Sequence, residues 1–330
     1  MTRSLSAVRA AAAAILLLLP AAGALGVRRT EDPLALVPAD AATVGVMHWN
    51  ELRQTPLGAK VFSHIDHMSG DDDAARFLQE TGLTPREDID TVTVAMTPGA
   101  PGQRPESGLV IFEGRFDLTR IAAALTSRGA KLQSSPAGEF YRLSDHNGES
   151  GAVALVNRTL LVCGNEAAVI AALGRRESGG EGGMTSGQGL GKHLSRVDRD
   201  ASAWALVDLV RFPAARPGGS EGEGRGEPAR ALVGAMKSVS LIAVQATVKG
   251  ENVEFAATGL AADAENRELL EDALKGVLAM WRLAVSDKAP ELVPVIRRFE
   301  IDSDAEGVSI RGTLPAGLLK SLSEKHQARN

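Results

Sequence analysis

The chain has 330 residues, a formal net charge of -5 and only 4% aromatic residues. Nucleic-acid-binding domains carry a basic stripe and often stacking aromatics, so this composition argues against a nucleic-acid partner. Cys163 is the single cysteine, so no intramolecular disulfide can form and no lipid-modified amino terminus is expected.

The first residues have the organisation of an export signal. Two arginines precede an apolar segment over residues 10–19, and Ala22–Ala24 fits a small-x-small cleavage site. We therefore predict a signal peptide over residues 1–24 and a mature protein in the periplasm or outside the cell. The competing interpretation is an uncleaved membrane anchor formed by residues 10–27.

Residues 25–177 are predicted to form a first α+β half. Asp117 and Asn165 stand at expected N-cap positions, because each precedes an apolar helical pattern. The predicted strands cover residues 43–49, 90–96, 108–114, 140–143, 152–156 and 159–163. The predicted helices begin near Thr55, Asp117 and Asn165, and a further short helix carries Phe77 and ends at Gly82.

Residues 178–198 are rich in glycine and are interpreted as a linker with a short helix, followed by a second α+β half over residues 199–330. Residues 213–228 are dense in Pro, Gly and Glu, which is typical of a disordered loop. Strands are predicted over 201–208, 238–249, 252–260, 298–303 and 308–314, and a long helix over 264–285 with Leu270, Leu274, Val277 and Trp281 on its buried face.

The order of elements is similar in the two halves. Each half starts with a strand, continues with two strands and a helix, and ends with further strands and a helix. We therefore predict an α+β fold with antiparallel sheet, built from two similar β-ββ-α-ββ-α halves with helices packed on one face. The sequence leaves open whether the halves share one continuous sheet or form two domains.

Several short motifs make the chain resemble a known group of proteins. They are Leu36–Asp40 before the first strand, Leu52–Gly58 after it, Leu160–Asn165 between a strand and a helix, and the ββαββ unit of the second half. With these motifs and the export signal, the chain is similar to a loose group of exported bacterial proteins of unknown function from acidobacterial and planctomycete-like genomes. The resemblance implies an α+β fold outside the cytoplasm and brings no catalytic residues.

The strongest metal candidates are His64, His67 and Asp71. The two histidines lie at i and i+3 and can share one helix face, and nearby aspartates add carboxylate ligands. The spacing matches no established motif, and a solvated acidic loop explains the aspartates more simply. We therefore predict neither a metal nor a cofactor, and we name no catalytic residue.

Other motifs also favour structural interpretations. The glycines of residues 187–192 lack the spacing and the leading strand of a phosphate-binding loop. Cys163 has no placed histidine beside it, and no serine lies in a hydrolase motif. The sequence therefore favours an exported, non-catalytic protein that acts in binding or envelope assembly with an envelope protein as partner. The first alternative is a carrier of a lipid or other apolar ligand, and the second is a hydrolase without a recognisable motif.

Overall fold

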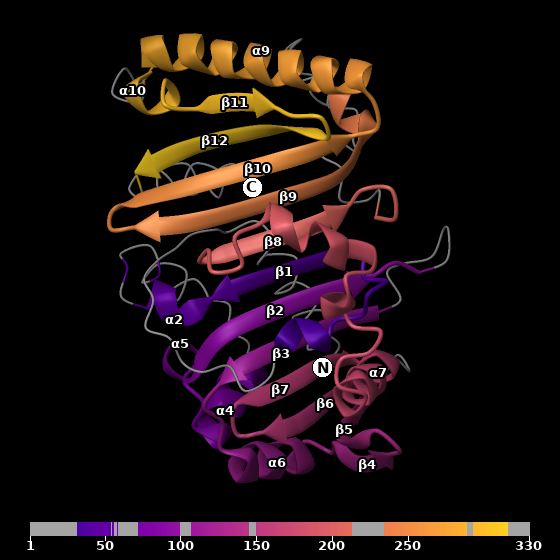
Figure 1. The fold of residues 1–330 in the computed structure, drawn as a ribbon. Coiled ribbons are helices and arrows are strands. Elements are labelled where there is room, and N and C mark those ends of the chain that lie inside the picture. Colours follow the sequence, from indigo (N-terminus) through magenta and orange to yellow (C-terminus); the bar gives the residue numbers. More distant parts are fainter. Residues whose placement is uncertain are drawn as a thin grey trace.

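The computed structural model describes residues 32–53, 55, 58, 72–99, 107–144, 150–212, 234–288 and 293–315. Its strands form one twelve-stranded sheet, and every pair of neighbouring strands is antiparallel. Figure 1 shows the sheet running through the whole molecule, with α9 at one end and α6 at the other. The predicted α+β fold is confirmed, and the two halves share one continuous sheet.

The strands follow the predicted positions closely, except that the strand over Lys131–Ser135 was not predicted. Their order across the sheet is β11-β12-β10-β9-β8-β1-β2-β3-β7-β6-β5-β4. In chain order they are β1 (Thr43–His48), β2 (Ile89–Thr97), β3 (Ser107–Gly114), β4 (Lys131–Ser135), β5 (Gly138–Ser144), β6 (Ser150–Asn157), β7 (Leu160–Asn165), β8 (Ala203–Asp208), β9 (Val239–Lys249), β10 (Asn252–Ala261), β11 (Glu300–Ser303) and β12 (Gly307–Pro315).

Apart from η1, which precedes β1, the described helices lie in the connections between the strands. They are η1 (Pro33–Ala35), α2 (Trp49–Leu52), α4 (Asp72–Thr81), α5 (Pro85–Asp88), α6 (Leu118–Ser127), α7 (Glu166–Glu177), η2 (Met184–Ser186), η3 (Gly189–Arg196), η5 (Met236–Ser238), α9 (Ala264–Lys288) and α10 (Val293–Ile296). Within the described residues, none of them is long and apolar enough to cross a membrane.

The two halves of the chain share one strand topology. Their first strands, β1 and β8, pair with each other in the middle of the sheet, with Gly45 opposite Ala205. From there β2 and β3 continue outward on one side, and β9 and β10 on the other. A helix then follows in each half, and the last strand of the half, β7 or β12, pairs with the third strand. The first half adds two outer strands, β4 and β5, and helix α7.

Helices cover both faces of the sheet, so the prediction that they pack on one face is wrong. On β7, Val162 belongs to the core cluster of α7, whereas its neighbour Leu161 belongs to the cluster of α6. Successive strand residues point to opposite faces, so α6 and α7 lie on opposite sides. Ala203 and Val207 share one face of β8, and they pack in the clusters of α6 and α9 respectively. We call the two sides the α7 face and the α9 face.

The predicted N-cap Asp117 is confirmed, and Asp263 caps α9 in the same way. The side chain of Asp117 accepts a hydrogen bond from the Arg120 amide (3.1 Å), and that of Asp263 accepts one from the Asn266 amide (2.8 Å). Asn165 stands at the N-cap of α7 but makes no capping bond. Its side-chain oxygen accepts from the Gly108 amide on the neighbouring strand (2.8 Å) instead, because Asn165 also ends β7 and lies beside β3.

Helix α9 packs on the sheet through the predicted face. Leu270 is 2% exposed, whereas Leu274 is only half-buried. Further along the helix, Trp281 packs edge-on against Phe299, with ring centroids 5.7 Å apart. Phe299 also contacts Phe255 of β10 (5.6 Å), so this aromatic cluster joins the helix to the outer strands.

The glycine-rich segment 178–198 is packed into the molecule, unlike an exposed linker. Met184 and Leu190 are almost fully buried in the core of the α7 face. A Cβ at Gly189 would collide with the Ala39 carbonyl, and one at Gly191 with the Met184 carbonyl. Close backbone packing therefore accounts for these glycines. The division of the chain at this segment stays a prediction.

Several predictions fall outside the described residues. They concern the signal peptide or anchor (1–24 or 10–27), the metal candidates His64, His67 and Asp71, and the loop at 213–228.

Candidate functional site

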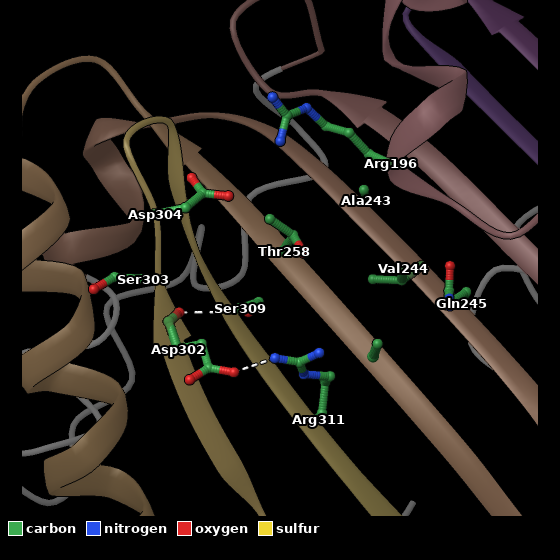
Figure 2. A pocket seen from close by; sticks show the side chains of 11 residues that line it. Arg196, Ala243, Val244, Gln245, Thr258, Asp302, Ser303, Asp304, Ser309 and Arg311 are labelled. Carbon is green, nitrogen blue, oxygen red and sulfur yellow. Dashed lines mark hydrogen bonds and ion pairs between the residues drawn. The ribbon is translucent and has the colours of Figure 1, made fainter.

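The α7 face differs between the two halves of the sheet. In the first half, α7 and the 3-10 helices cover it. In the second half, a hollow of about 500 Å³ opens on this face over β9, β10, β11 and β12. Figure 2 shows its floor, which includes Thr258, Ser309 and Arg311, and the Arg196 guanidinium extending from η3 toward the turn that carries Asp304.

Cross-strand register brings these side chains together. Ala243, Thr258 and Ser309 lie directly opposite one another on β9, β10 and β12. Residues directly opposite on antiparallel strands point to the same face, so all three side chains line the hollow. Gln245 stands two residues further along β9, and its side-chain oxygen accepts from the Asp198 amide (2.6 Å). This bond ties the segment that follows η3 to the floor of the hollow.

The charged groups at the hollow are largely paired with one another. Arg311 forms an ion pair with Asp302, and Arg196 forms one with Glu306. The Asp304 carboxylate accepts from the Glu306 and Gly307 amides (2.7 and 2.8 Å), which holds the β11–β12 turn. Because opposite charges balance, the hollow suits a polar partner that offers hydrogen bonds better than a strongly charged ion.

A second, smaller hollow lies at the opposite end of the sheet. It has a volume of about 400 Å³ and lies between α6 and strands β4 to β6. Its lining includes Leu118, Leu155 and Leu132, the last of which is 52% exposed. This hollow is open and more apolar, and the titratable side chains of its described lining are Glu139 and Tyr141.

Four polar side chains form a row across the centre of the sheet on the α7 face. His48 lies opposite Thr91, and Thr91 lies opposite Glu113. On the other side of His48, the backbone carbonyl of Ser202 accepts a hydrogen bond from the His48 backbone amide (2.9 Å). The His48 ring nitrogen Nδ1 lies 2.8 Å from the Ala201 carbonyl, an arrangement in which Nδ1–H donates.

This row combines the residue types of a nucleophile and a base, but solvent does not reach them. Ser202 is 0% exposed and His48 is 5% exposed. A hydrolase needs a nucleophile that a substrate can approach. The row therefore has the character of a hydrogen-bonded part of the core.

Cys163 has the properties of a structural cysteine. It lies on β7 between Val110 and Val153 of the neighbouring strands. Removal from water raises the pKa of its thiol to about 12, which suppresses the reactive thiolate at neutral pH.

The structure brings together residues that the sequence patterns did not connect. Arg196, Thr258 and Arg311 come from three separate segments, and nothing in their local sequences marks a site. A usable signal was the alternation of polar and apolar residues along β10 and β12, which indicates one solvated face. Within the described residues, no group of three or more His, Cys, Asp or Glu side chains is placed to hold a metal ion.

The comparisons with known proteins add no family. No protein-family model matches the chain, and no curated protein matches it significantly. Solved structures of TP0453 are similar in outline. Crystal form III has a TM-score of 0.49 and 11% identity, covering 88% of this chain and 97% of that one. Crystal form I has a TM-score of 0.45 and 10% identity, with coverages of 91% and 99%. Crystal form IV has a TM-score of 0.47 and 11% identity, with coverages of 89% and 96%.

Proposed function

We propose that this protein is an exported, non-catalytic binding protein of the cell envelope that takes a polar partner, an envelope protein, on the uncovered α7 face of its second half. The observation that carries the proposal is the hollow of about 500 Å³ lined by Arg196, Thr258 and Arg311. Its location outside the cytoplasm rests on the export signal in residues 1–24 and on the resemblance to exported bacterial proteins.

The packing of α9 favours this function over the carrier alternative. A carrier would need an apolar cavity beneath the long helix. Instead, a Cβ added at Gly259 of β10 would lie 3.2 Å from the Leu270 side chain, so helix and sheet are in direct contact there. An acyl chain has no space between them at this point.

The hydrolase alternative has less support. The row of Ser202, His48, Thr91 and Glu113 has the required residue types, but its serine and histidine are buried. The described residues that line the polar hollow include no histidine and no cysteine. Binding therefore accounts for the surface features with fewer additional assumptions.

Native mass spectrometry of the protein purified from its own envelope tests the proposal. Thr258→Tyr would fill the hollow from its floor, and Thr313→Tyr is the matched control, because Thr313 lies on the same face of β12 and outside the hollow lining. We expect a protein partner on the wild type and on the control, and its loss from Thr258→Tyr. Retention by Thr258→Tyr, or a lipid in its place, would contradict the proposal.

The export signal has its own test. Expressed in a bacterium with a working secretion pathway, the mature protein is expected to begin at or near Leu25, which follows the predicted cleavage site. An intact Met1 on protein recovered from the envelope would favour the uncleaved anchor.

A further inference from the structure

The two edge strands of the sheet differ in how they are held. At one edge, β11 is tied to α9, because the Ser303 hydroxyl donates a hydrogen bond to Glu271 (2.5 Å). At the other edge, β4 pairs with β5 alone. Figure 1 shows β4 at the end of the sheet that lies opposite α9. Lys131, Leu132 and Ser134 are exposed, so solvent reaches this edge.

The backbone of β4 has hydrogen-bonding groups that point away from β5. Ser135 and Gly138 flank a two-residue turn and lie opposite each other, so they are hydrogen-bonded to each other. Along an antiparallel strand, residues that bond to the neighbouring strand alternate with residues whose N–H and C=O point outward. The outward residues of β4 are therefore Leu132 and Ser134. Such an edge is a template for another extended chain.

The smaller, apolar hollow lies directly beside this edge. Its lining includes Leu132 of β4 and Tyr141 of β5, which lie opposite each other, and Leu118 of α6. Leu132 is 52% exposed, so its outer side has room for a neighbour. Residues directly opposite on antiparallel strands point to the same face. A side chain opposite Leu132 on an added strand would therefore pack beside Leu132 at this hollow.

The other face of β4 favours an acidic residue in the added strand. Lys131 points to the α7 face, where it lies beside Arg142 of β5. Arg142 forms an ion pair with Glu166, whereas Lys131 has no ion pair within the described residues. A carboxylate opposite Lys131 would balance its charge. The β4 strand of a second copy offers none, because Lys131 is the only charged residue of Lys131–Ser135.

We propose that β4 binds an extended segment of another protein, which joins the sheet as a further antiparallel strand. In this segment apolar residues alternate with acidic ones. An apolar side chain lies opposite Leu132 at the smaller hollow, and a carboxylate lies opposite Lys131. Backbone hydrogen bonds to Leu132 and Ser134 hold the segment, and the alternating side chains select it. The proposal does not depend on the polar hollow, which lies in the other half of the sheet.

Amide hydrogen exchange with a defined peptide tests the added strand. The probe is an end-capped peptide of about seven residues in which valine alternates with aspartate. In the free protein, the amides of Leu132 and Ser134 are expected to exchange fast, because they have no acceptor on β5. The peptide is expected to slow both by at least about tenfold, while amides of β9 and β10 keep their rates. Unchanged rates at about 1 mM peptide would overturn the proposal.

The free protein gives a further outcome. Slow exchange of Leu132 and Ser134 without peptide, becoming slower as the protein concentration rises, would identify a second copy as the occupant of β4. Slow exchange that is independent of concentration would mean that the chain itself covers this edge. Either result would overturn the proposal.

Two methylated peptides separate strand addition from simple apolar binding. Valines opposite Leu132 and Ser134 direct their N–H groups toward β4, whereas the aspartate N–H groups point to solvent. Methylation of the valine nitrogens is therefore expected to abolish the slower exchange. Methylation of the aspartate nitrogens, which leaves the side chains equally unchanged, is the matched control and is expected to preserve it. Equal effects of the two peptides would exclude an added strand in this register.

A reversed charge tests the acidic positions. Lys131→Glu is expected to weaken binding of the aspartate peptide by about fivefold at low salt, and to strengthen binding of a peptide with lysine in place of aspartate by a similar factor. Lys249→Glu is the matched control, because Lys249 is an exposed lysine on β9, in the other half of the sheet. This control is expected to leave the affinity for both peptides unchanged. If Lys131→Glu also leaves both affinities unchanged, the segment that β4 binds is not acidic and the proposal fails.

Discussion

The two halves of the sheet share a strand topology but differ in how their faces are covered. In the first half, α6 and α7 seal opposite faces, and both sides of β7 are buried. In the second half, α9 seals one face, and the other face carries the polar hollow. The same arrangement of strands is therefore covered on both faces in the first half, whereas in the second half it leaves part of the α7 face open at the polar hollow.

The strand sequences explain this difference. Leu160, Leu161 and Val162 of β7 form a continuous apolar run, which is typical of a strand buried on both faces. On β12, polar Ser309 and Arg311 alternate with apolar Val308 and Ile310. Alternation of this kind places the polar residues on a solvated face, so the uncovered surface is already encoded in β12.

The largest expected effect tests how much the second half depends on the aromatic cluster around Phe299. Phe299 is 6% exposed and contacts both Trp281 and Phe255. Phe299→Ala is expected to lower the free energy of unfolding by about 3–5 kcal/mol, as truncation of a buried phenylalanine does. Chemical denaturation monitored by circular dichroism measures this change.

Hydrogen exchange of the same variant shows whether the halves are independent. If each half has its own core, amides of β10 and β12 are expected to exchange faster while those of β6 and β7 keep the wild-type rates. Equally faster amide exchange in all four strands would mean that the continuous sheet unfolds as one unit. The two halves would then differ only in how their surfaces are covered, and not in stability.

The second prediction compares one face in the two halves. Leu160 lies on the α7 face of the first half and is 4% exposed, whereas Thr258 lies on the same face of the second half. Leu160→Ala is expected to cost about 2–5 kcal/mol of unfolding free energy. Thr258→Ala, which removes only a solvated hydroxyl and methyl, is expected to change it by less than about 0.5 kcal/mol. Similar losses in both variants would show that the second half is covered on this face too.

The sequence predicted the strands well because their apolar runs and turns are local. The β9–β10 turn at Gly250 is an example: Gly250 has a φ of 62°, which glycine adopts without strain. The side of the sheet on which each helix lies was not predictable from the same patterns. An apolar stripe indicates that a helix is buried, but it does not indicate which face of the sheet the helix covers. The expectation of a single covered face is therefore wrong for α7, which packs on the opposite face from α6 and α9.

The candidate site was harder to predict from the sequence than the strands were. Its floor depends on which residues lie opposite each other, and register is set by the whole sheet. Arg196 reaches the hollow only because the glycine-rich segment before it packs into the core through Met184 and Leu190. The glycine-rich composition of this segment favoured a linker. Glycine is common both in flexible linkers and at close backbone contacts, so composition does not distinguish the two.

The third prediction contrasts the starts of α7 and α9. Asp263 caps α9, and the hydrogen bonds from Asn266 lower the pKa of its carboxyl below the ordinary 3.8. A lowered pKa in the folded state stabilises the fold above that ordinary value, and the contribution is lost as the pH falls through the folded-state pKa. Asn165 at the start of α7 does not titrate.

Melting curves between pH 2 and pH 7 for the wild type and Asp263→Asn measure this contribution. The asparagine keeps an acceptor for the Asn266 amide but carries no charge. The wild type is therefore expected to lose its advantage over the variant as the pH falls below about 4. A difference between the two proteins that stays constant over this range would show that the charge of Asp263 contributes nothing.

The smallest expected effect concerns the polar side of α9. Glu271 forms an ion pair with Lys275, four residues further along the helix, at 2.5 Å, and accepts a hydrogen bond from the Ser303 hydroxyl of β11 at 2.5 Å. The pKa of Glu271 is lowered by Lys275 first and by Ser303 second. Because the pair is solvated, Glu271→Ala is expected to lower the melting temperature far less than Leu160→Ala, and about 1 M NaCl should remove most of the difference through screening. Glu268→Ala, an exposed carboxylate on the same helix, is the control and is expected to have no measurable effect. A loss for Glu271→Ala that persists in salt would instead assign the contribution to the neutral bond with Ser303, and would mean that α9 also holds the edge strand β11 through its polar side.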